Sequence, residues 1–273
     1  GAVYKSDDAG TSWQQILSKI IVYDIAFHPT QSNVIYAAGT FGGHGKALMT
    51  SDGGKSWQEI YNEEAKSDPV RTLAINPRNP SEVVIGLQSG QLIASTDSGQ
   101  HWKLLQKLQT QIQRLYWNDS GLFILLQRKG LLKSVDGGVT VTDLTTTLFA
   151  QGSQVSQFLA NKQAGPFYQA AIDSSGQRIY LAAETALLRS VDGGNSWEAL
   201  NLPLNTKGVV IRSLAVSPSS PNVLYVGAGA TIYKTIDDGS SWQTQSIPTT
   251  GYIQVILIDP RLPQKAFAGI YIQ

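Results

Sequence analysis

The sequence lacks cysteine entirely, which excludes disulfide bonds and thiolate chemistry in this chain. It contains no apolar run of about 18 residues, the length that crosses a bilayer as a helix, so no transmembrane segment is predicted. Charge is also scarce, because the net charge is +1 and charged residues are 15% of the chain, against a usual share of about 25%. The basic residues do not cluster, so a nucleic-acid partner is not predicted.

Signatures of catalysis and metal binding are missing too. The chain has no G-x-S-x-G motif and no H-E-x-x-H motif. Its three histidines, His28, His44 and His101, do not have the spacing of a metal site. We therefore predict neither a metal site nor a cofactor. A surface rich in Ser, Thr, Gln and Asn, with little charge, favours an extracytoplasmic location, and we expect a monomer.

The sequence does contain one eight-residue phrase six times, with the pattern S/T-x-D-x-G-x-S/T-W. The first copy ends at Trp13, and in the fourth copy Val141 stands where Trp is expected. The central aspartates are Asp8, Asp52, Asp97, Asp136, Asp192 and Asp237. Their spacings are 44, 45, 39, 56 and 45 residues, and a step near 45 is typical of a radial or stacked repeat architecture.

The phrase has the composition of a tight turn between two strands. Each copy lies between apolar or β-branched runs, which is the pattern of a hairpin. The Asp side chain accepts hydrogen bonds from nearby backbone N–H groups, Gly supplies a positive φ, and Trp opens the next strand and buries apolar area. Six copies are too many for one active site, so we interpret the aspartates as structural staples and not as metal ligands or acid–base groups.

A second pattern surrounds the turns. Two apolar strands joined by a Pro turn precede most copies, as in Ile25–Pro29 followed by Asn33–Tyr36. Together with the two strands of the phrase, they give four antiparallel strands per unit of about 45 residues, which is the content of a propeller blade. We predict an all-β fold, a six-bladed β-propeller of four-stranded antiparallel blades, as a single domain over residues 1–273.

The two ends of the chain hold complementary halves of one blade. Gly1–Lys5 is predicted as a third strand, and Gln254–Ile258 and Ala266–Gly269 are predicted as first and second strands. We expect these halves to pair and to close the ring. The surplus of the 56-residue step falls in residues 144–166, with a short helix predicted at Ser153–Lys162. This connection is either a binding loop or a tolerated insertion.

The repeated phrase resembles the Asp-box, or bacterial neuraminidase repeat, and the likeness covers almost the whole chain. This resemblance implies a β-propeller. It does not imply one activity, because the motif occurs in sialidases, xyloglucanase-like glycosidases, sortilin-type receptors and the photosystem II assembly factor family.

Aligning the units brings out one position near the start of each first strand. Its six residues are Tyr23, Arg71, Gln113, Tyr168, Arg212 and Gln254. The order Tyr, Arg, Gln occurs twice, which indicates a duplicated three-blade unit. We expect these side chains to surround the mouth of the central channel, where arginine forks bind a carboxylate or another anion and tyrosine rings stack. The alternative is that they are consensus residues packed between blades.

We therefore predict a non-catalytic module that binds a protein or carbohydrate ligand at this mouth. One alternative is a glycoside hydrolase of the sialidase type, a class that uses three arginines, a tyrosine–carboxylate nucleophile pair and an acid. The matching residues would be Arg71, Arg114 and Arg212, then Tyr168 with Glu184, and Asp24 or Asp68. A further alternative is a structural repeat module of a larger surface protein.

Overall fold

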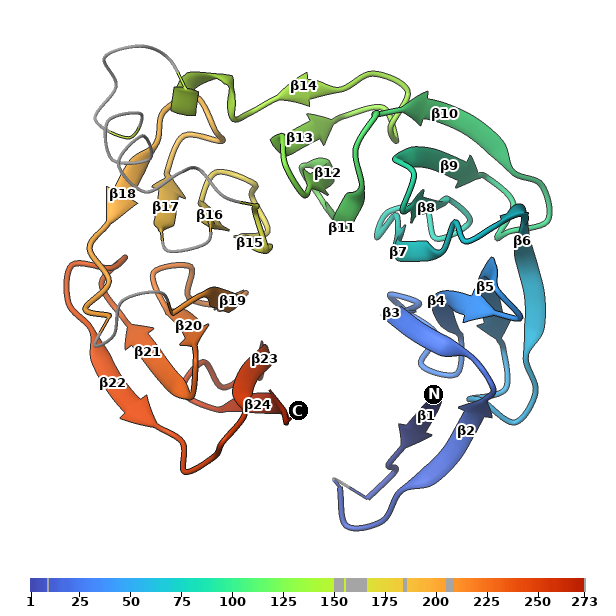
Figure 1. Cartoon of the computed structure of the whole chain (residues 1–273), viewed down its shortest axis with the longest axis horizontal. Helices are drawn as coiled ribbons and strands as arrows, with labels where there is room; N and C mark the ends of the chain where they lie inside the picture. The colour runs from blue at the N-terminus through green and yellow to red at the C-terminus, as the bar shows by residue number, and fades with distance from the viewer. Residues whose placement is uncertain (9, 150–154, 156–165, 184–185, 205–208, 273) are drawn as a thin grey trace. The chain divides into compact units, whose positions relative to one another are not determined.

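The computed structural model describes residues 1–8, 10–149, 155, 166–183, 186–204 and 209–272. These residues have the all-β architecture that the repeats predict (Figure 1). The strands β1 to β24 form seven antiparallel sheets, five with four strands and two with two strands. Sheets of four antiparallel strands in chain order are the blades of a β-propeller.

The chain divides into two compact units, and the first comprises residues 1–126 and 133–142. Its first sheet pairs β1 (Ala2–Lys5) with β2 (Gln14–Ser18). The second contains β3 (Ile21–Phe27), β4 (Ile35–Phe41), β5 (His44–Thr50) and β6 (Gln58–Lys66). The third contains β7 (Val70–Ile75), β8 (Val83–Leu87), β9 (Gln91–Ser95) and β10 (Lys103–Lys107). The next sheet supplies residues to both units and contains β11 (Ile112–Asn118), β12 (Gly121–Leu126), β13 (Gly130–Ser134) and β14 (Thr142–Asp143).

The second unit comprises residues 127–132 and 143–273 and begins its own elements with the short 3-10 helix η1 (Thr146–Phe149). One of its sheets contains β15 (Gln169–Ile172), β16 (Ile179–Ala182), β17 (Leu187–Ser190) and β18 (Glu198–Leu200). Another contains β19 (Ile211–Val216), β20 (Leu224–Ala228), β21 (Thr231–Thr235) and β22 (Gln243–Ser246). The last pairs β23 (Tyr252–Ile258) with β24 (Ala266–Tyr271).

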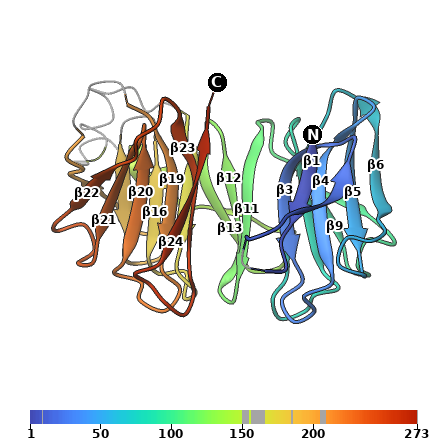
Figure 2. The same ribbon diagram turned by 90° about the horizontal axis from the view of Figure 1, so that it is seen from below.

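Within each unit the sheets meet through their first strands. In the first unit β3 contacts β7 and β7 contacts β11, and in the second unit β15 contacts β19 and β19 contacts β23. Figure 2 shows these sheets from the side, with the strands of each unit running along its height. The second strands are the most buried, because every residue of β8, β16 and β20 is buried. Their continuous apolar sequence indicates a strand covered on both faces.

The two halves of the predicted closing blade are present as two separate two-stranded sheets, β1–β2 and β23–β24. The number of blades and the pairing of the chain ends therefore stay predictions. The helix predicted at Ser153–Lys162 lies outside the described residues except for Val155. Among the described residues, no helix has the length and apolar character needed to cross a bilayer.

Candidate functional site

The six repeated turns share one hydrogen-bond pattern, which the turn after β5 illustrates. One oxygen of Asp52 accepts from the Thr50 hydroxyl at 2.7 Å and from the Ser56 backbone N–H at 3.0 Å. The other oxygen accepts from the Ser56 hydroxyl at 2.6 Å. The Thr50 hydroxyl in turn accepts from the Gly54 N–H at 2.9 Å. Each aspartate thus joins the two ends of its turn with its full carboxylate.

The same contacts recur around Asp8, Asp97, Asp136, Asp192 and Asp237. Only the turn after β9 differs, because His101 Nδ1 replaces the hydroxyl at 2.6 Å from Asp97. Hydrogen bonds from the side chain and the backbone four residues later lower the pKa of Asp8, Asp136 and Asp237 to about 2. These carboxylates are therefore ionised, and both oxygens of each accept hydrogen bonds within their own turn. No cluster of three metal-ligating side chains occurs in the part of the chain that the structure describes.

The tryptophan of a turn joins its sheet to the preceding sheet. The indole N–H of Trp57 donates to the Ile16 carbonyl of β2 at 2.7 Å, and that of Trp102 donates to the Ile60 carbonyl of β6 at 2.6 Å. In the second unit Trp197 donates to the Leu144 carbonyl at 2.8 Å. The burial predicted for this position is wrong for Trp13, which is 64% exposed. Trp13 belongs to the first copy, and its indole donates within its own turn to Gly10 at 3.1 Å.

The six residues singled out by the repeat alignment lie at backbone irregularities of the first strands. Five of them are the unpaired residue where the register between first and second strand shifts: Tyr23, Arg71, Gln113, Arg212 and Gln254. Tyr168 directly precedes β15, and its N–H donates to the carbonyl of Ala182, the residue that also pairs with Gln169. A β-bulge turns its extra side chain out of the regular alternation, so the five bulge positions present their side chains in one common way.

In the first unit the bulges bring a tyrosine and an arginine together. The Arg71 guanidinium lies 4.2 Å from the centroid of the Tyr23 ring, which is cation–π stacking distance. Arg71 forms no ion pair among the described residues, and its Nε is buried without a hydrogen-bond partner in that same set. Gln113, the third member, accepts a hydrogen bond from Gln111 at 3.1 Å. The Arg71 guanidinium thus stacks on the Tyr23 ring, and its N–H donors are available to another group.

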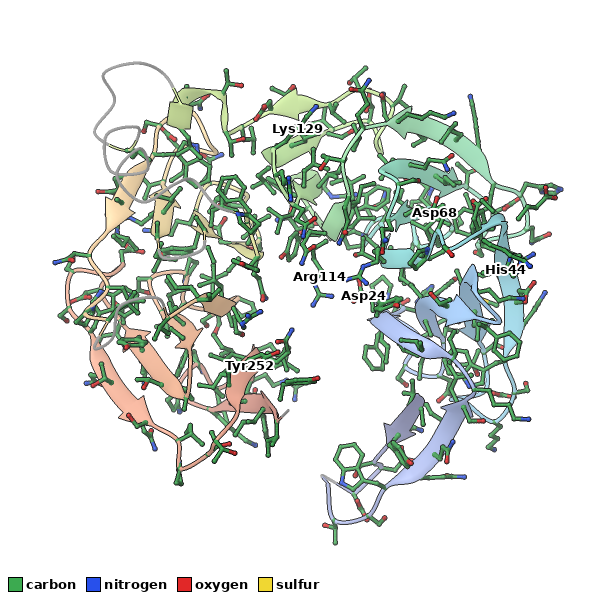
Figure 3. All side chains as sticks on the ribbon, viewed as in Figure 1. Asp24, His44, Asp68, Arg114, Lys129 and Tyr252 are labelled. Carbon is green, nitrogen blue, oxygen red and sulfur yellow. The ribbon has the colours of Figure 1, made fainter. Side chains whose placement is uncertain are left out.

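The residues that follow the bulges in the first unit form a network across three strands. Asp24 of β3 accepts from Arg114 of β11 at 2.7 Å and from the Thr72 hydroxyl of β7 at 2.7 Å. The Thr72 hydroxyl accepts from the Leu115 N–H at 3.0 Å, and the Leu73 N–H donates to Asp24 at 3.2 Å. Figure 3 shows Asp24 and Arg114 side by side. Burial lowers the pKa of Arg114, but the interactions with Asp24 and Tyr116 together outweigh it and the pKa is raised.

An open hollow of about 440 Å³ lies against this network in the first unit. Tyr4, Tyr23, Asp24 and Arg114 supply its polar side chains, and apolar residues of β1 and β3 supply the rest. The bulge tyrosine, the partly buried Asp24–Arg114 ion pair and the hollow are therefore one connected surface.

The second unit repeats the arrangement with different neighbours. The Arg212 guanidinium lies 5.6 Å from the Tyr168 ring and 4.7 Å from the Tyr252 ring. Arg212 also forms no ion pair among the described residues. Gln254, the third member, is exposed. The alignment missed Tyr252, which lies two positions before Gln254 and so outside the aligned position.

The residues proposed for sialidase chemistry are divided between the two units, so their assembly into one catalytic set stays a prediction. Arg114 and Asp24 are committed to each other, and Asp68 accepts from the Ser89 N–H at 2.9 Å. Glu184, the predicted carboxylate partner of Tyr168, lies outside the described residues. The Asp24 network itself was missed, although its polar residues all directly follow the aligned position.

Comparisons with solved structures identify β-propellers of low sequence identity. A GH74 enzyme from Niastella koreensis has a TM-score of 0.76 and 17% identity, over 97% of this chain and 47% of the enzyme. The chain thus spans about half of that enzyme's length. YCF48 bound to D1 peptide has a TM-score of 0.72 and 19% identity, over 98% of this chain and 83% of that one. Sqt1 of Chaetomium thermophilum, bound to the N-terminus of the ribosomal protein L10, has a TM-score of 0.65 and 18% identity, over 92% and 70% of the two chains.

No curated protein sequence matches the chain significantly. Two family models do match it. Residues 1–163 match the model described as sortilin, neurotensin receptor 3, and residues 105–261 match the model of the photosynthesis system II assembly factor YCF48. Each match covers more than half of the 273 residues, so the chain belongs to the BNR/Vps10-like β-propellers that these two family models describe.

Proposed function

We propose that this chain is a non-catalytic binding module that takes a protein ligand through the Tyr–Arg–Gln residues at its strand bulges. The observation that carries the proposal is the state of Arg71 and Arg212. Both guanidiniums stack on tyrosine rings, and neither has a carboxylate partner among the described residues. A planar fork held in place and left without an anion is suited to a carboxylate of a ligand.

The similar structures agree with a protein ligand. YCF48 is bound to a D1 peptide in one of them, and Sqt1 is bound to the N-terminus of a ribosomal protein in another. In the proposal, the tyrosines offer faces for apolar side chains and Gln113 and Gln254 offer amides for backbone groups of a peptide. A carbohydrate ligand would use the same groups, and we rank it second.

The likeness to GH74 enzymes makes a glycoside hydrolase the competing function. Such an enzyme needs two acidic groups about 5–9.5 Å apart, or a tyrosine in place of one of them. The acids proposed for this role already have partners, because Asp24 is ion-paired with Arg114 and Asp68 is hydrogen-bonded to backbone. These contacts favour the binding module over the hydrolase. A structural repeat module of a larger surface protein is the third possibility.

The proposal includes the finer architecture expected from the sequence. It assigns six blades, a closing blade assembled from β1–β2 and β23–β24, and structural Asp-boxes at the six turns. A monomer and an extracytoplasmic location belong to it as well.

A peptide array tests the function. The array carries 15-residue peptides, each in a form with a free C-terminal carboxylate and in an amidated form, and fluorogenic glycosides are screened in parallel. We expect peptide binding that Arg71→Ala and Arg212→Ala weaken by about tenfold, since one lost charge-assisted hydrogen bond is worth about 1.5–3 kcal/mol. Arg78→Ala is the matched control, because Arg78 is exposed and paired with Asp119. Turnover of a glycoside by the parent, or binding that ignores both substitutions, would overturn the proposal.

A further inference from the structure

A buried tyrosine of the second strand reaches the repeated turn of the next sheet at two places among the described residues. Tyr36 of β4 is 1% exposed, and while burial raises the pKa of its hydroxyl, the nearby Ser98 side chain in the turn of the next sheet opposes that rise. Tyr180 of β16 is 0% exposed, and its hydroxyl donates to Asp238 of the next turn at 3.0 Å. Ser98 and Asp238 both directly follow the central aspartate of their turn. The ring and its hydroxyl therefore fill the space between two sheets at the turn end of the strands.

The β7–β10 sheet lacks both parts of this connection. Val84 has the register of Tyr36, because each is paired with an alanine of the first strand, Ala74 and Ala26. The residue after the central aspartate of the next turn is Gly137. The ring and its polar partner are therefore missing together at this one junction of the first unit.

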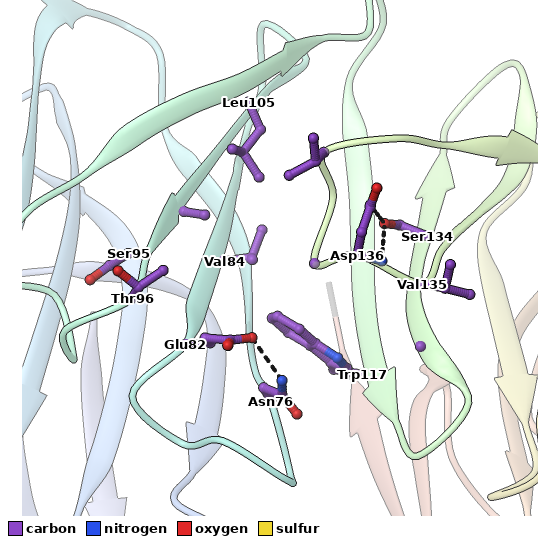
Figure 4. Close-up of a pocket in the computed structure, with 14 residues that line it drawn as sticks. Asn76, Glu82, Val84, Ser95, Thr96, Leu105, Trp117, Ser134, Val135 and Asp136 are labelled. Atoms are coloured by element: carbon purple, nitrogen blue, oxygen red, sulfur yellow. Dashed lines mark hydrogen bonds between the residues drawn. The ribbon is translucent and has the colours of Figure 1, made fainter.

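A hollow of about 420 Å³ lies at this junction, and Figure 4 shows it. Val84, Leu105 and the Trp117 ring give it an apolar wall, and Gly137 forms part of its rim. Glu82 and Asp136 line it as well, and no Lys or Arg is among the described residues that line it. The hollow thus combines space, an aromatic wall and negative charge.

The Glu82 carboxylate can accept further hydrogen bonds. Each Glu82 oxygen accepts from an asparagine amide at 2.8 Å, Asn76 on one side and Asn79 on the other. A carboxylate oxygen has two lone pairs, so each keeps one for another donor. Bonds from two amides hold the carboxylate in place beside the hollow.

We propose that this hollow binds a tyrosine side chain of a partner protein. The phenol ring takes the space that Tyr36 and Tyr180 fill at the equivalent junctions and stacks against Trp117, and its hydroxyl donates to Glu82. Negative charge around the hollow rejects a phosphorylated tyrosine. The site lies at the turn end of the strands, whereas the bulges lie at the start of the first strands, so this inference does not rest on the proposed function.

The test is an NMR titration of the full chain with N-acetyl-L-tyrosinamide. We expect a dissociation constant of about millimolar, as for other ligands of this size, with shifts at Val84, Trp117 and Gly137. The analogous phenylalanine amide lacks the hydroxyl and should bind several-fold more weakly, and the phosphotyrosine amide should not bind. Equal shifts for all three compounds, or shifts elsewhere in the chain only, would overturn the proposal.

A variant whose own side chains fill the hollow can be compared with the parent chain. Val84→Tyr combined with Gly137→Ser restores the pair found at Tyr36 and Ser98, and we expect it to abolish the titration shifts and to raise the melting temperature. Val191→Tyr adds the same ring at a turn residue that is 51% exposed, and it should leave binding unchanged. Unchanged binding in the filled variant contradicts the proposal. If that variant does not fold, the proposal is tested by the parent chain alone, through the relative affinities of the three compounds and the residues whose signals shift.

Discussion

The two units present the same first-strand residues but support them differently. Both place a tyrosine ring beside an arginine at a bulge, Tyr23 with Arg71 and Tyr168 with Arg212. In the first unit the next positions hold Asp24, Thr72 and Arg114, which bond to one another across three strands. In the second unit they hold Gln169, Ser213 and Val255.

In the second unit the residues at these positions form fewer hydrogen bonds. Gln169 donates to the Leu214 carbonyl at 3.2 Å, while the Ser213 hydroxyl is buried without a hydrogen-bond partner among the described residues. Both units therefore place an arginine at a bulge. The residue after the bulge decides how many hydrogen bonds join the neighbouring first strands.

Acid should produce the largest effect, because it acts on all six turns at once. A carboxyl whose folded pKa is lowered stabilises the fold fully above its unfolded value of about 3.9, and that stability is lost as the pH falls through the folded pKa of about 2. Four of the six aspartates, Asp8, Asp52, Asp97 and Asp136, belong to the first unit. Urea midpoints measured from pH 5 to pH 2 should therefore fall steeply below pH 4.

Hydrogen exchange by mass spectrometry then separates the units. After correction for the intrinsic rate at each pH, peptides of the first unit should lose protection at a higher pH than peptides of the second. Equal loss in both units would show that the number of turn carboxylates does not set acid stability.

Removal of the Asp24 carboxylate should be the most damaging single substitution of this set. Asp24→Ala leaves Arg114, Thr72 and the Leu73 N–H without their acceptor in a site where the Asp24 side chain is 13% exposed. We expect a loss of about 2 kcal/mol in the free energy of unfolding, below the cost of breaking a fully buried pair because the Arg114 side chain is 35% exposed. The counterpart Gln169→Ala should cost less than about 1 kcal/mol, since one neutral hydrogen bond is lost. Similar costs, measured by urea unfolding, would remove the contrast between the units.

The buried hydroxyls of Thr72 in β7 and Ser213 in β19 give a more closely matched comparison of the two units. Thr72→Val deletes a hydroxyl that bonds both Asp24 and the Leu115 N–H, and should cost about 1–3 kcal/mol. Ser213→Ala deletes a hydroxyl with no partner among the described residues, so it should be neutral or stabilising. The free energy of unfolding of both variants is the measurement. Destabilisation by Ser213→Ala as large as that by Thr72→Val would mean that Ser213 has a partner in solution.

The smallest expected effect concerns the tryptophans of the turns. Trp57→Phe loses the hydrogen bond to Ile16, at a cost of about 1 kcal/mol beyond the change in ring size. The indole N–H of Trp242 has no partner among the described residues, and the Leu200 carbonyl at the equivalent place accepts from the Leu202 N–H. Trp242→Phe therefore carries only the cost of the smaller ring. The measurement is the melting temperature of each variant. Equal decreases would contradict the statement that, of these two tryptophans, only Trp57 donates a hydrogen bond to the preceding sheet.

The fold features that the sequence predicted are local ones. Each turn is closed within eight residues by its own Asp, Gly and hydroxyl groups, so its pattern is visible in the chain. The aligned first-strand position was predicted as equivalent in all six units, and its bulge geometry follows from the register of two adjacent strands.

The features that escaped prediction combine residues from distant strands. Asp24 and Arg114 are 90 residues apart, and their pairing depends on how three sheets pack within the first unit. The hollow at Val84 becomes visible only when Tyr36 and Tyr180 show what normally fills that place. Neither signal lies in a short stretch of sequence, because each depends on the contact between sheets.

The central claim is that the bulge arginines bind a carboxylate of a protein ligand. Calorimetric titration of the strongest peptide from the array, with a free and with an amidated C-terminus, tests it directly in the parent chain, Arg71→Ala, Arg71→Lys and Arg78→Ala. The account predicts that the free carboxylate binds more tightly than the amide, that both Arg71 variants weaken it because lysine lacks the fork, and that Arg78→Ala leaves it unchanged. Equal affinities for all four proteins would contradict the account.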